Sequence, residues 1–251
     1  MPQAKPYIGV TGFMNRDEVR AALEVVPADS DRQLMVGVLM SLKTLRGQTN
    51  RWPGRYPERE AVSEIFVDDP KTLNLIHFST DESLTLSLQL NQLLEIGGPN
   101  LDGFQLNMVW PSIGDLEDFS EAYPNLTLIL QIGVRAIKEV GSTEAFAEMV
   151  GHYVPTISGI LLDPSGGRGR EFNPNEVIPY LRAARQYPTL GLGVAGGLGP
   201  SSLSTLETLQ FAFPHISIDA ESRLRKSLPD DLDREKVRSY LTQAYQLFSQ
   251  R

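Results

Sequence analysis

The feature that most constrains this chain is the regular alternation of short apolar runs with stretches of helical spacing along its length. Strands that alternate with helices are typical of a parallel sheet. Eight such units in 251 residues match the size of a closed (β/α)₈ barrel. We therefore predict an α/β protein, a TIM barrel that forms a single domain over residues 1–251. The expected strands are Tyr7–Thr11, Gln33–Met40, Asn74–Phe78, Gly103–Val109, Leu126–Ile132, Ile157–Asp163, Leu190–Ala195 and Ile216–Asp219.

The connections between these units are short, except for a long loop after the second strand, at about 41–59. Long loops in compact domains are usually functional or mobile. The alternative fold is an open doubly wound sheet, but the first strand lacks the G-x-G-x-x-G that such a sheet uses for dinucleotides. The first expected helix begins at Asn15 or Asp17 and ends at Val26. One further helix begins near Pro174, and the others cover Pro57–Val67, Leu84–Ile96, Ile113–Ala122, Thr143–Tyr153, Ser201–Phe211 and Asp233–Phe248.

Composition excludes several classes of function. The net charge is −8, which argues against a nucleic-acid partner because such proteins need a basic face. The chain has no cysteine, so disulfides, thiolate zinc sites and thiol catalysis are excluded. The N-terminus lacks a signal-peptide pattern, and no apolar run approaches the ~20 residues of a membrane span. We expect a cytoplasmic protein with no membrane partner, no cofactor and an oligomeric state that the sequence leaves open.

Two apolar runs end abruptly in glycines and are the best candidates for a ligand site. ISGILLDPSGGRG (157–169) places Asp163 where a buried strand emerges into a loop. LGLGVAGGLGP (190–200) places Gly196 and Gly197 just before a helix start at Pro200, where backbone N–H groups favour an anion. The glycines could instead serve only tight packing, and the aspartate could be only a loop cap.

Polar side chains also mark the ends of the other strands, which meet at one mouth of a barrel. The loop after the second strand adds Lys43, Arg46, Arg51 and Arg55, and the loop after the sixth adds Arg168 and Arg170. His77 is either functional or a hydrogen-bonded wall residue. His152 and His215 fall at the other side, so no metal site is expected. The strand-end residues are His77, Gln105, Asn107, Gln131, Asp163 and Asp219.

Several of these motifs, taken in order, resemble the phosphoribosylanthranilate isomerase family, a group of (β/α)₈ barrels. The pair LLDPSGGRGREFNP and VAGGLGPSSL is the most specific part of the match. IGVTGFMNRDEV and GFQLN are similar to the family's first and fourth strands, and SIDAES is a weaker match to its eighth.

The resemblance implies roles for the matching positions. Asp163 would be the general acid that opens the sugar ring. Gly196, Gly197 and Ser222 would lie near the substrate phosphate. Lys43 or Arg46 would meet the anthranilate carboxylate.

The chain departs from the family at three places. The family's general base is a cysteine on strand one, where this chain has Ile8 or Gly9, and neither can accept a proton. Asn107 replaces a histidine on strand four. Arg223 replaces a glycine near the phosphate, which it would either contact by charge or block.

The sequence therefore supports a phosphoribosylanthranilate isomerase-like barrel that binds a phosphorylated sugar-type small molecule but is not an active phosphoribosylanthranilate isomerase. One alternative is an isomerase, epimerase or lyase on a sugar phosphate, with Asp163 as acid and a substitute base. His77 and Asp219 are the candidates, and Asp219 is the better placed because strand eight adjoins strand one. The other alternative is a non-catalytic sensor or scaffold that retains the phosphate pocket.

Overall fold

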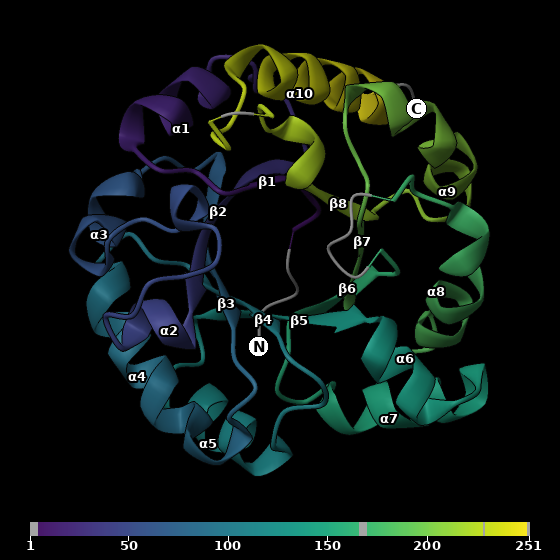
Figure 1. Ribbon diagram of the computed structural model, residues 1–251. Coiled ribbons are helices and arrows are strands. Elements are labelled where there is room, and N and C mark those ends of the chain that lie inside the picture. Colours follow the sequence, from purple (N-terminus) through teal and green to yellow (C-terminus); the bar gives the residue numbers. More distant parts are fainter. Residues whose placement is uncertain (1–4, 166–169, 228, 250–251) are drawn as a thin grey trace.

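The computed structural model describes residues 5–165, 170–227 and 229–249, and it is a closed barrel of eight parallel strands. The strands follow one another around the ring in chain order, and the helices form an outer layer (Figure 1). The predicted (β/α)₈ fold is therefore confirmed. The strands are β1 (Tyr7–Thr11), β2 (Gln33–Ser41), β3 (Thr72–Ser79), β4 (Gly103–Asn107), β5 (Thr127–Gly133), β6 (Gly159–Asp163), β7 (Gly191–Ala195) and β8 (Ser217–Ala220).

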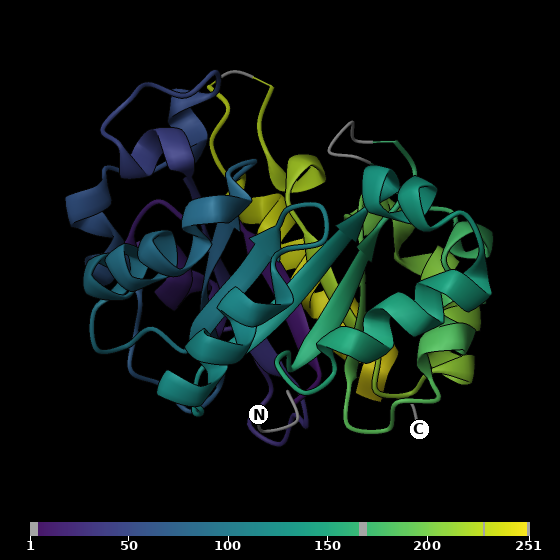
Figure 2. The ribbon, with the colours of Figure 1, turned by 90° about the horizontal axis from the view of Figure 1, so that it is seen from below.

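The barrel is closed by parallel pairing of the last strand with the first. Ile8 pairs with Ile218 and Gly9 with Asp219 in the β1–β8 ladder. Seen from the side, all strands point toward one end, and the long loop after β2 and the loop after β8 lie above that end (Figure 2). This end is the mouth, the face on which TIM barrels carry their sites.

The helices largely follow the sequence prediction. Within the described part of the chain, none is both long and apolar enough to cross a bilayer. The α-helices are α1 (Arg16–Leu23), α2 (Leu42–Leu45), α3 (Val62–Ile65), α4 (Leu86–Gly97), α5 (Ile113–Ala122), α6 (Val134–Val140), α7 (Thr143–Tyr153), α8 (Ile178–Ala184), α9 (Glu207–Ala212) and α10 (Arg234–Ser249). Short 3₁₀ segments lie at Pro53–Arg55, Arg59–Ala61, Ser83–Thr85, Pro174–Glu176, Pro200–Leu206 and Ser222–Leu224.

Three expectations about helices were wrong. Helix α6 was missed because it starts directly after β5, with no polar cap to mark its beginning. The helix expected over Pro57–Val67 is only a 3₁₀ turn followed by α3, and the helix expected from Ser201 starts with a 3₁₀ segment. The long loop is also partly ordered, since it contains α2.

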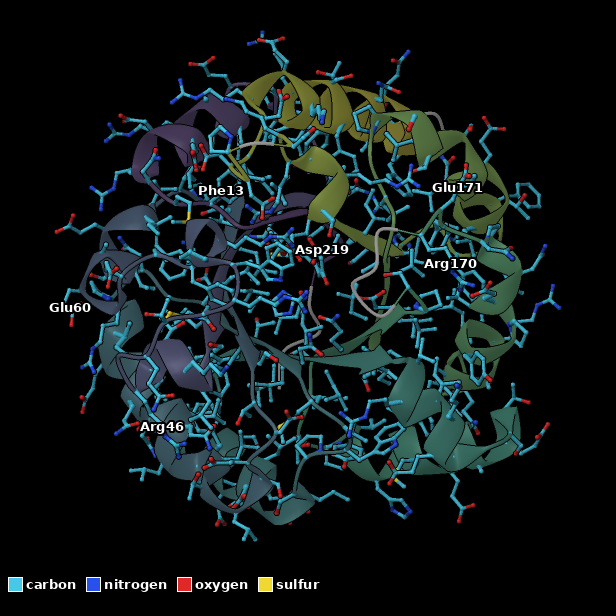
Figure 3. All side chains as sticks on the ribbon, in the orientation of Figure 1. Phe13, Arg46, Glu60, Arg170, Glu171 and Asp219 are labelled. Atoms are coloured by element: carbon cyan, nitrogen blue, oxygen red, sulfur yellow. The ribbon has the colours of Figure 1, made fainter. Side chains whose placement is uncertain are left out.

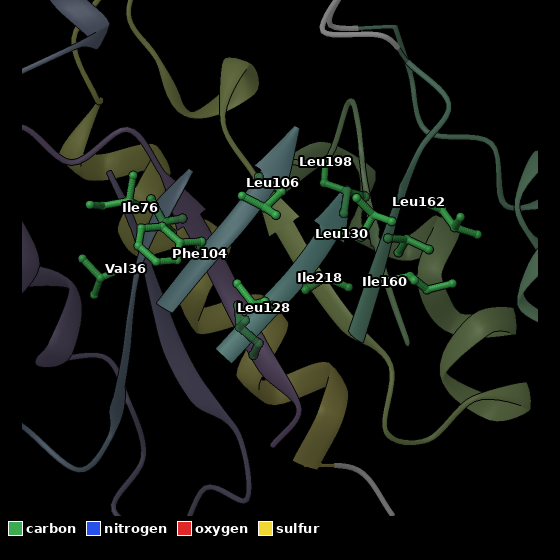
Figure 4. Close-up of a cluster of buried hydrophobic side chains, with 14 of the residues drawn as sticks. Val36, Ile76, Phe104, Leu106, Leu128, Leu130, Ile160, Leu162, Leu198 and Ile218 are labelled. Carbon is green, nitrogen blue, oxygen red and sulfur yellow. The ribbon is translucent and has the colours of Figure 1, made fainter. Parts of the chain in front are cut away.

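The strands bury both faces, and the alternation of side chains decides which residues reach the barrel interior. Phe104 and Leu106 of β4 point outward into the layer between sheet and helices, which holds most of the core (Figure 4). Gln105 lies between them in the sequence and points inward. The interior holds a small apolar cluster made by Tyr7, Met35, Leu73, Leu75, Ile129, Leu161 and Ala195. The polar strand-end residues follow this cluster toward the mouth.

Candidate active site

Six polar side chains from six strands meet inside the mouth of the barrel and form one hydrogen-bonded network. Asp219 lies near the middle of the ring, whereas Arg46 lies far out, near α2 (Figure 3). All six are buried: Gln105 is 0% exposed, Asp219 4% and Asp163 8%. The network consists of Thr11, His77, Gln105, Gln131, Asp163 and Asp219.

Asp219 accepts hydrogen bonds from two sides of the barrel. The Thr11 hydroxyl on β1 donates to Oδ1 at 3.0 Å and to Oδ2 at 2.9 Å. The Gln105 amide on β4, the strand opposite β8, donates to Oδ2 at 3.3 Å. The carboxyl group is thus held in the centre of the mouth.

Burial raises the pKa of Asp219 to about 7, although the hydrogen bonds from Thr11 and Gln105 favour the ionised form. The negative charges of Glu221 and Asp163 add to the rise. Desolvation dominates because a charge in the apolar interior loses its hydration. A carboxyl group with this pKa exchanges protons readily near neutral pH.

The Asp219 carboxyl group occupies the space that a side chain on strand one would need. A Cβ atom on Gly9 would lie 2.8 Å from Asp219 Oδ1 and 2.7 Å from Met35 Cε, both too close for ordinary contact. Ile8, in contrast, is fully buried in the outer layer and faces away from the site. Of the two residues considered for the strand-one base position, only Gly9 faces the site, and Asp219 fills the room it leaves.

Asp163 lies at the end of β6, two strands around the barrel from Asp219. Gln131 Nε2 donates to its Oδ2 at 3.0 Å, and the Ser165 backbone N–H and hydroxyl donate to its Oδ1 at 3.0 and 2.7 Å. Gly196 must lack a side chain here, because its Cβ would lie 2.4 Å from Asp163 Oδ1. Hydrogen bonds to both oxygens orient the carboxyl group.

His77 contacts Gln105 rather than either carboxylate. Its Nδ1 lies 3.3 Å from Gln105 Nε2. Burial lowers the pKa of His77 to about 4, so the imidazole is neutral at pH 7. This environment suits a hydrogen-bonded wall residue, the second interpretation that the sequence left open.

The expected phosphate cradle is closely packed. Gly196 and Gly197 have φ values of 92° and 72°, which favour glycine. A Cβ on Gly197 would lie 1.8 Å from the Arg170 carbonyl oxygen, and one on Gly199 would lie 2.8 Å from Arg223 Cβ. Arg223 therefore packs its stem against the glycine loop. Ser222 begins a 3₁₀ turn beside it.

The expected substrate-binding cations lie away from the network. Arg46 forms two hydrogen bonds with Glu82, at 2.9 and 2.7 Å, and both side chains are about half exposed. A cavity of about 450 Å³ lies between the loops that follow β2 and β3, and its lining includes Lys43, Arg46, Arg51, Trp52, Tyr56 and Glu82. Asn107 is half-buried at the end of β4. Arg170 pairs with Glu176, and Arg168 lies outside the described residues.

The long loop after β2 is joined by ion pairs to the segment after β8. Arg55 forms ion pairs with Glu221 at 3.1 Å and with Asp230 at 2.5 Å. Arg225, which is buried, lies 3.6 Å from Glu221 and donates to the Asp230 carbonyl oxygen. We refer to Arg55, Glu221, Asp230 and Arg225 as the latch.

The sequence did not point to Thr11 of the network, to Ser165, which donates to Asp163, or to three members of the latch, Glu221, Asp230 and Arg225. Thr11 is the last residue of β1, so the strand-end rule applied to the other strands would have found it. Ser165 follows Asp163 by two residues, a spacing at which a serine can donate to an aspartate. Within the described ranges, no cluster of three potential ligand side chains could hold a metal ion.

Comparison with known proteins gives the fold but no sequence relative. No model of a protein family matches the chain, and no curated protein does. Among solved structures, the phosphoribosyl anthranilate isomerase of Thermus thermophilus is 16% identical and has a TM-score of 0.65, with 96% of this chain and 99% of that chain covered. TrpF from Jonesia denitrificans is 17% identical at a TM-score of 0.61, with 98% of each chain covered.

Other barrels are also similar. The catalytic domain of a chitinase from Pyrococcus furiosus is 11% identical at a TM-score of 0.58, with 100% of this chain and 98% of that chain covered. At such identities the likeness shows the fold alone. The chain thus has the TIM-barrel fold, and phosphoribosylanthranilate isomerases are among the solved structures that share it.

Proposed function

We propose that this barrel binds a phosphorylated sugar-type small molecule at its mouth and moves a proton on it, as an isomerase, epimerase or lyase. The observation that carries the proposal is Asp219, a buried carboxyl group with a pKa of about 7 in the space of a missing strand-one side chain. Buried groups whose pKa is shifted toward neutrality are characteristic of active sites. Asp219 is the general base in this proposal, and Asp163 is the general acid.

The two carboxyl groups come from different strands and are approached by different donors. Asp219 and Asp163 are linked through Gln105 and Gln131, so a small molecule above this layer could contact both. Proton transfer by a positioned side chain contributes roughly 10²–10⁴-fold to a rate. His77, which is neutral and bonded to Gln105, supports the network and is not the base.

The reaction in this proposal is not that of phosphoribosylanthranilate isomerase. The chain lacks any cysteine, and the Asp219 carboxyl group lies in the space beside Gly9. The base in this proposal is therefore a carboxylate instead of a thiolate, and the proposed substrate differs too. The remaining substrate contacts in the proposal are Lys43, Arg46 and Asn107 around the mouth, and Gly196, Gly197, Ser222 and Arg223 near a phosphate.

The test is a screen of phosphorylated metabolites for thermal stabilisation, because a ligand of the folded state raises stability by mass action. Hits are then assayed for turnover, together with phosphoribosylanthranilate. We expect a hit that is converted, with turnover reduced 10²–10⁴-fold in Asp219→Asn and binding retained. His77→Gln is the matched control and should keep most of the activity. Turnover of phosphoribosylanthranilate at 1 s⁻¹ or more, about the lower end of ordinary enzymes, would contradict the proposed reaction class.

A second candidate function is ligand binding without catalysis. It is favoured by the complete burial of Gln105 at the centre of the mouth and by the packing of Arg170 on Gly197. Under this alternative a metabolite stabilises the protein, no product forms, and Asp219→Asn leaves the affinity unchanged.

A further inference from the structure

Two glutamine side chains connect the candidate base to the candidate acid. Gln105 Nε2 donates to Asp219 Oδ2 at 3.3 Å and to Gln131 Oε1 at 3.1 Å. Gln131 Nε2 in turn donates to Asp163 Oδ2 at 3.0 Å. The result is an unbroken chain of hydrogen bonds across the mouth, from β8 through β4 and β5 to β6.

The direction of these hydrogen bonds depends on the charge at both ends. A carboxylate only accepts hydrogen bonds, so an ionised Asp219 and an ionised Asp163 both require an NH₂ group facing them. The observed chain meets both requirements, and it leaves Gln105 Oε1 as a buried oxygen without a hydrogen-bond partner among the described residues. The chain is therefore set for two ionised carboxyl groups, at the cost of one unsatisfied oxygen.

Turning both amides over gives the opposite arrangement. Gln131 then presents its oxygen to Asp163 and its NH₂ group to Gln105, and Gln105 presents its oxygen to Asp219. In this arrangement both carboxyl groups must carry protons and donate them, and the Gln105 NH₂ group takes the buried position where Oε1 had no partner among the described residues. Gln105 Nε2 has only two hydrogens, and both are used for Asp219 and Gln131, so His77 Nδ1 accepts no hydrogen in the observed arrangement. After the turn, the tautomer of His77 that carries its proton on Nδ1 can donate to Gln105 Oε1. One amide cannot turn alone without an oxygen–oxygen or NH₂–NH₂ contact.

We propose that Gln105 and Gln131 are positioning residues that couple the protonation of Asp219 to that of Asp163 by turning over together. No proton passes along the amides, and only their orientation changes. In the ligand-free protein the coupling favours the same state for both carboxyl groups, either both protonated or both ionised, so a bound substrate must break it before Asp163 acts as acid and Asp219 as base. The inference deepens the proposed function, in which these groups are acid and base, but the coupling exists in the ligand-free protein and is measured without a substrate.

Charges around Asp219 predict the opposite response, which makes the coupling testable. The groups facing Asp219 are Tyr7 from β1, His77 from β3, Asp163 from β6, Glu221 after β8 and Tyr240 from α10. The tyrosines and His77 are uncharged near pH 7, so Asp163 and Glu221 supply the nearby charge. By Coulomb interaction alone, removal of the Asp163 charge must lower the pKa of Asp219.

Asp163→Asn distinguishes the coupling through the glutamines from the Coulomb interaction, because the two predict opposite shifts in the pKa of Asp219. The Ser165 backbone N–H can only donate, so the asparagine oxygen stays on that side and its NH₂ group faces Gln131. Gln131 and Gln105 must then turn over, and Gln105 presents its oxygen to Asp219. We expect the pKa of Asp219 to rise by about one pH unit, the effect of exchanging one hydrogen bond to a charged group. The measurement is a ¹³C NMR titration of aspartate-labelled, ligand-free protein, with Asp219 assigned from Asp219→Asn.

Two further variants serve as controls. Asp163→Ala removes the charge but leaves no NH₂ group to turn the chain, so the pKa of Asp219 should fall. Asp163→Asn combined with Gln131→Met interrupts the chain, and the pKa should fall there too. The inference is overturned if Asp163→Asn lowers the pKa or leaves it unchanged, or if the rise persists with methionine at position 131. Neither outcome affects the metabolite assay, so loss of the coupling and loss of the proposed function are separate results.

Discussion

Carboxyl groups at the centre of the mouth and at its rim accept hydrogen bonds of similar length, but their pKa values shift in opposite directions. At the rim, Arg46 holds the pKa of Glu82 below its usual range, mainly through their hydrogen bonds. At the centre, Asp219 also accepts hydrogen bonds, yet burial raises its pKa to about 7. The difference teaches that the surrounding medium, rather than the number of donors, decides the charge of a carboxyl group in this barrel.

The pH dependence of stability is the largest effect by which this comparison can be tested. The folded-state pKa of Asp219 is about 7 and its ordinary value is 3.8, so between these values the folded protein holds a proton that the unfolded chain has lost. Stability from this group is therefore present below about pH 4 and is lost as the pH rises toward 7. The asparagine in Asp219→Asn does not ionise, so this loss of stability with rising pH is absent from the variant.

We expect the free energy of unfolding of Asp219→Asn, relative to that of wild type, to rise by about 3 kcal/mol between pH 5 and pH 8. The wild type loses about 1.36 kcal/mol for each pH unit up to the folded-state pKa of Asp219. Urea denaturation at pH 5, 6, 7 and 8 measures this difference. Glu82→Gln at the rim is the control, and its difference from wild type should stay constant over this range. A constant difference for Asp219→Asn as well would remove the distinction between centre and rim.

A smaller effect is expected from Gly9→Ala. The new methyl group would lie 2.7 Å from Met35 Cε and 2.8 Å from Asp219 Oδ1, so both must move. Overpacking of this kind costs about 1–3 kcal/mol. Displacement of Asp219 should also reduce turnover of any substrate found.

Gly114→Ala is the matched control for Gly9→Ala. A Cβ there would lie 4.0 Å from the nearest atom, Ser112 Oγ, in helix α5. The alanine should stabilise by about 0.5–1 kcal/mol because glycine is a poor helix former. If Gly9→Ala is as stable as wild type by denaturation, the space at Gly9 is not filled by Asp219 as described.

The smallest effect is expected for the Arg46–Glu82 pair at the rim, which can be compared directly with the latch. Arg55 is half-buried and bridges two carboxylates, so Arg55→Ala should cost about 1–3 kcal/mol and free the long loop. Arg46→Ala should have no measurable effect on stability, because its ion pair is exposed. Limited trypsin digestion at Arg51 reports loop opening. Equal cleavage rates in Arg55→Ala and wild type would show that the latch does not hold the loop.

Much of the fold could be predicted because the periodicity of each strand is local information. Asp163 and Asp219 were found by the same reasoning, since a parallel barrel brings all strand ends to one face. The contact between Gln105 and Asp219 could not be predicted, because it joins opposite strands and depends on side-chain reach across the barrel. Helix α6 was missed for lack of a cap signal, and the packing of Arg170 on Gly197 depends on a loop path that no periodicity describes.

The closure of β8 onto β1 has a consequence for when the site comes into existence during folding. The Thr11–Asp219 hydrogen bond joins residues 208 positions apart, and the Gln105–Asp219 bond joins residues 114 apart. Contacts of such sequence separation form late, because the entropy of closing the intervening chain is lost first. In a half-formed barrel Asp219 is exposed to water, and its pKa keeps the ordinary value of an aspartate. Its unusual affinity for a proton is thus acquired only when the last strand completes the ring.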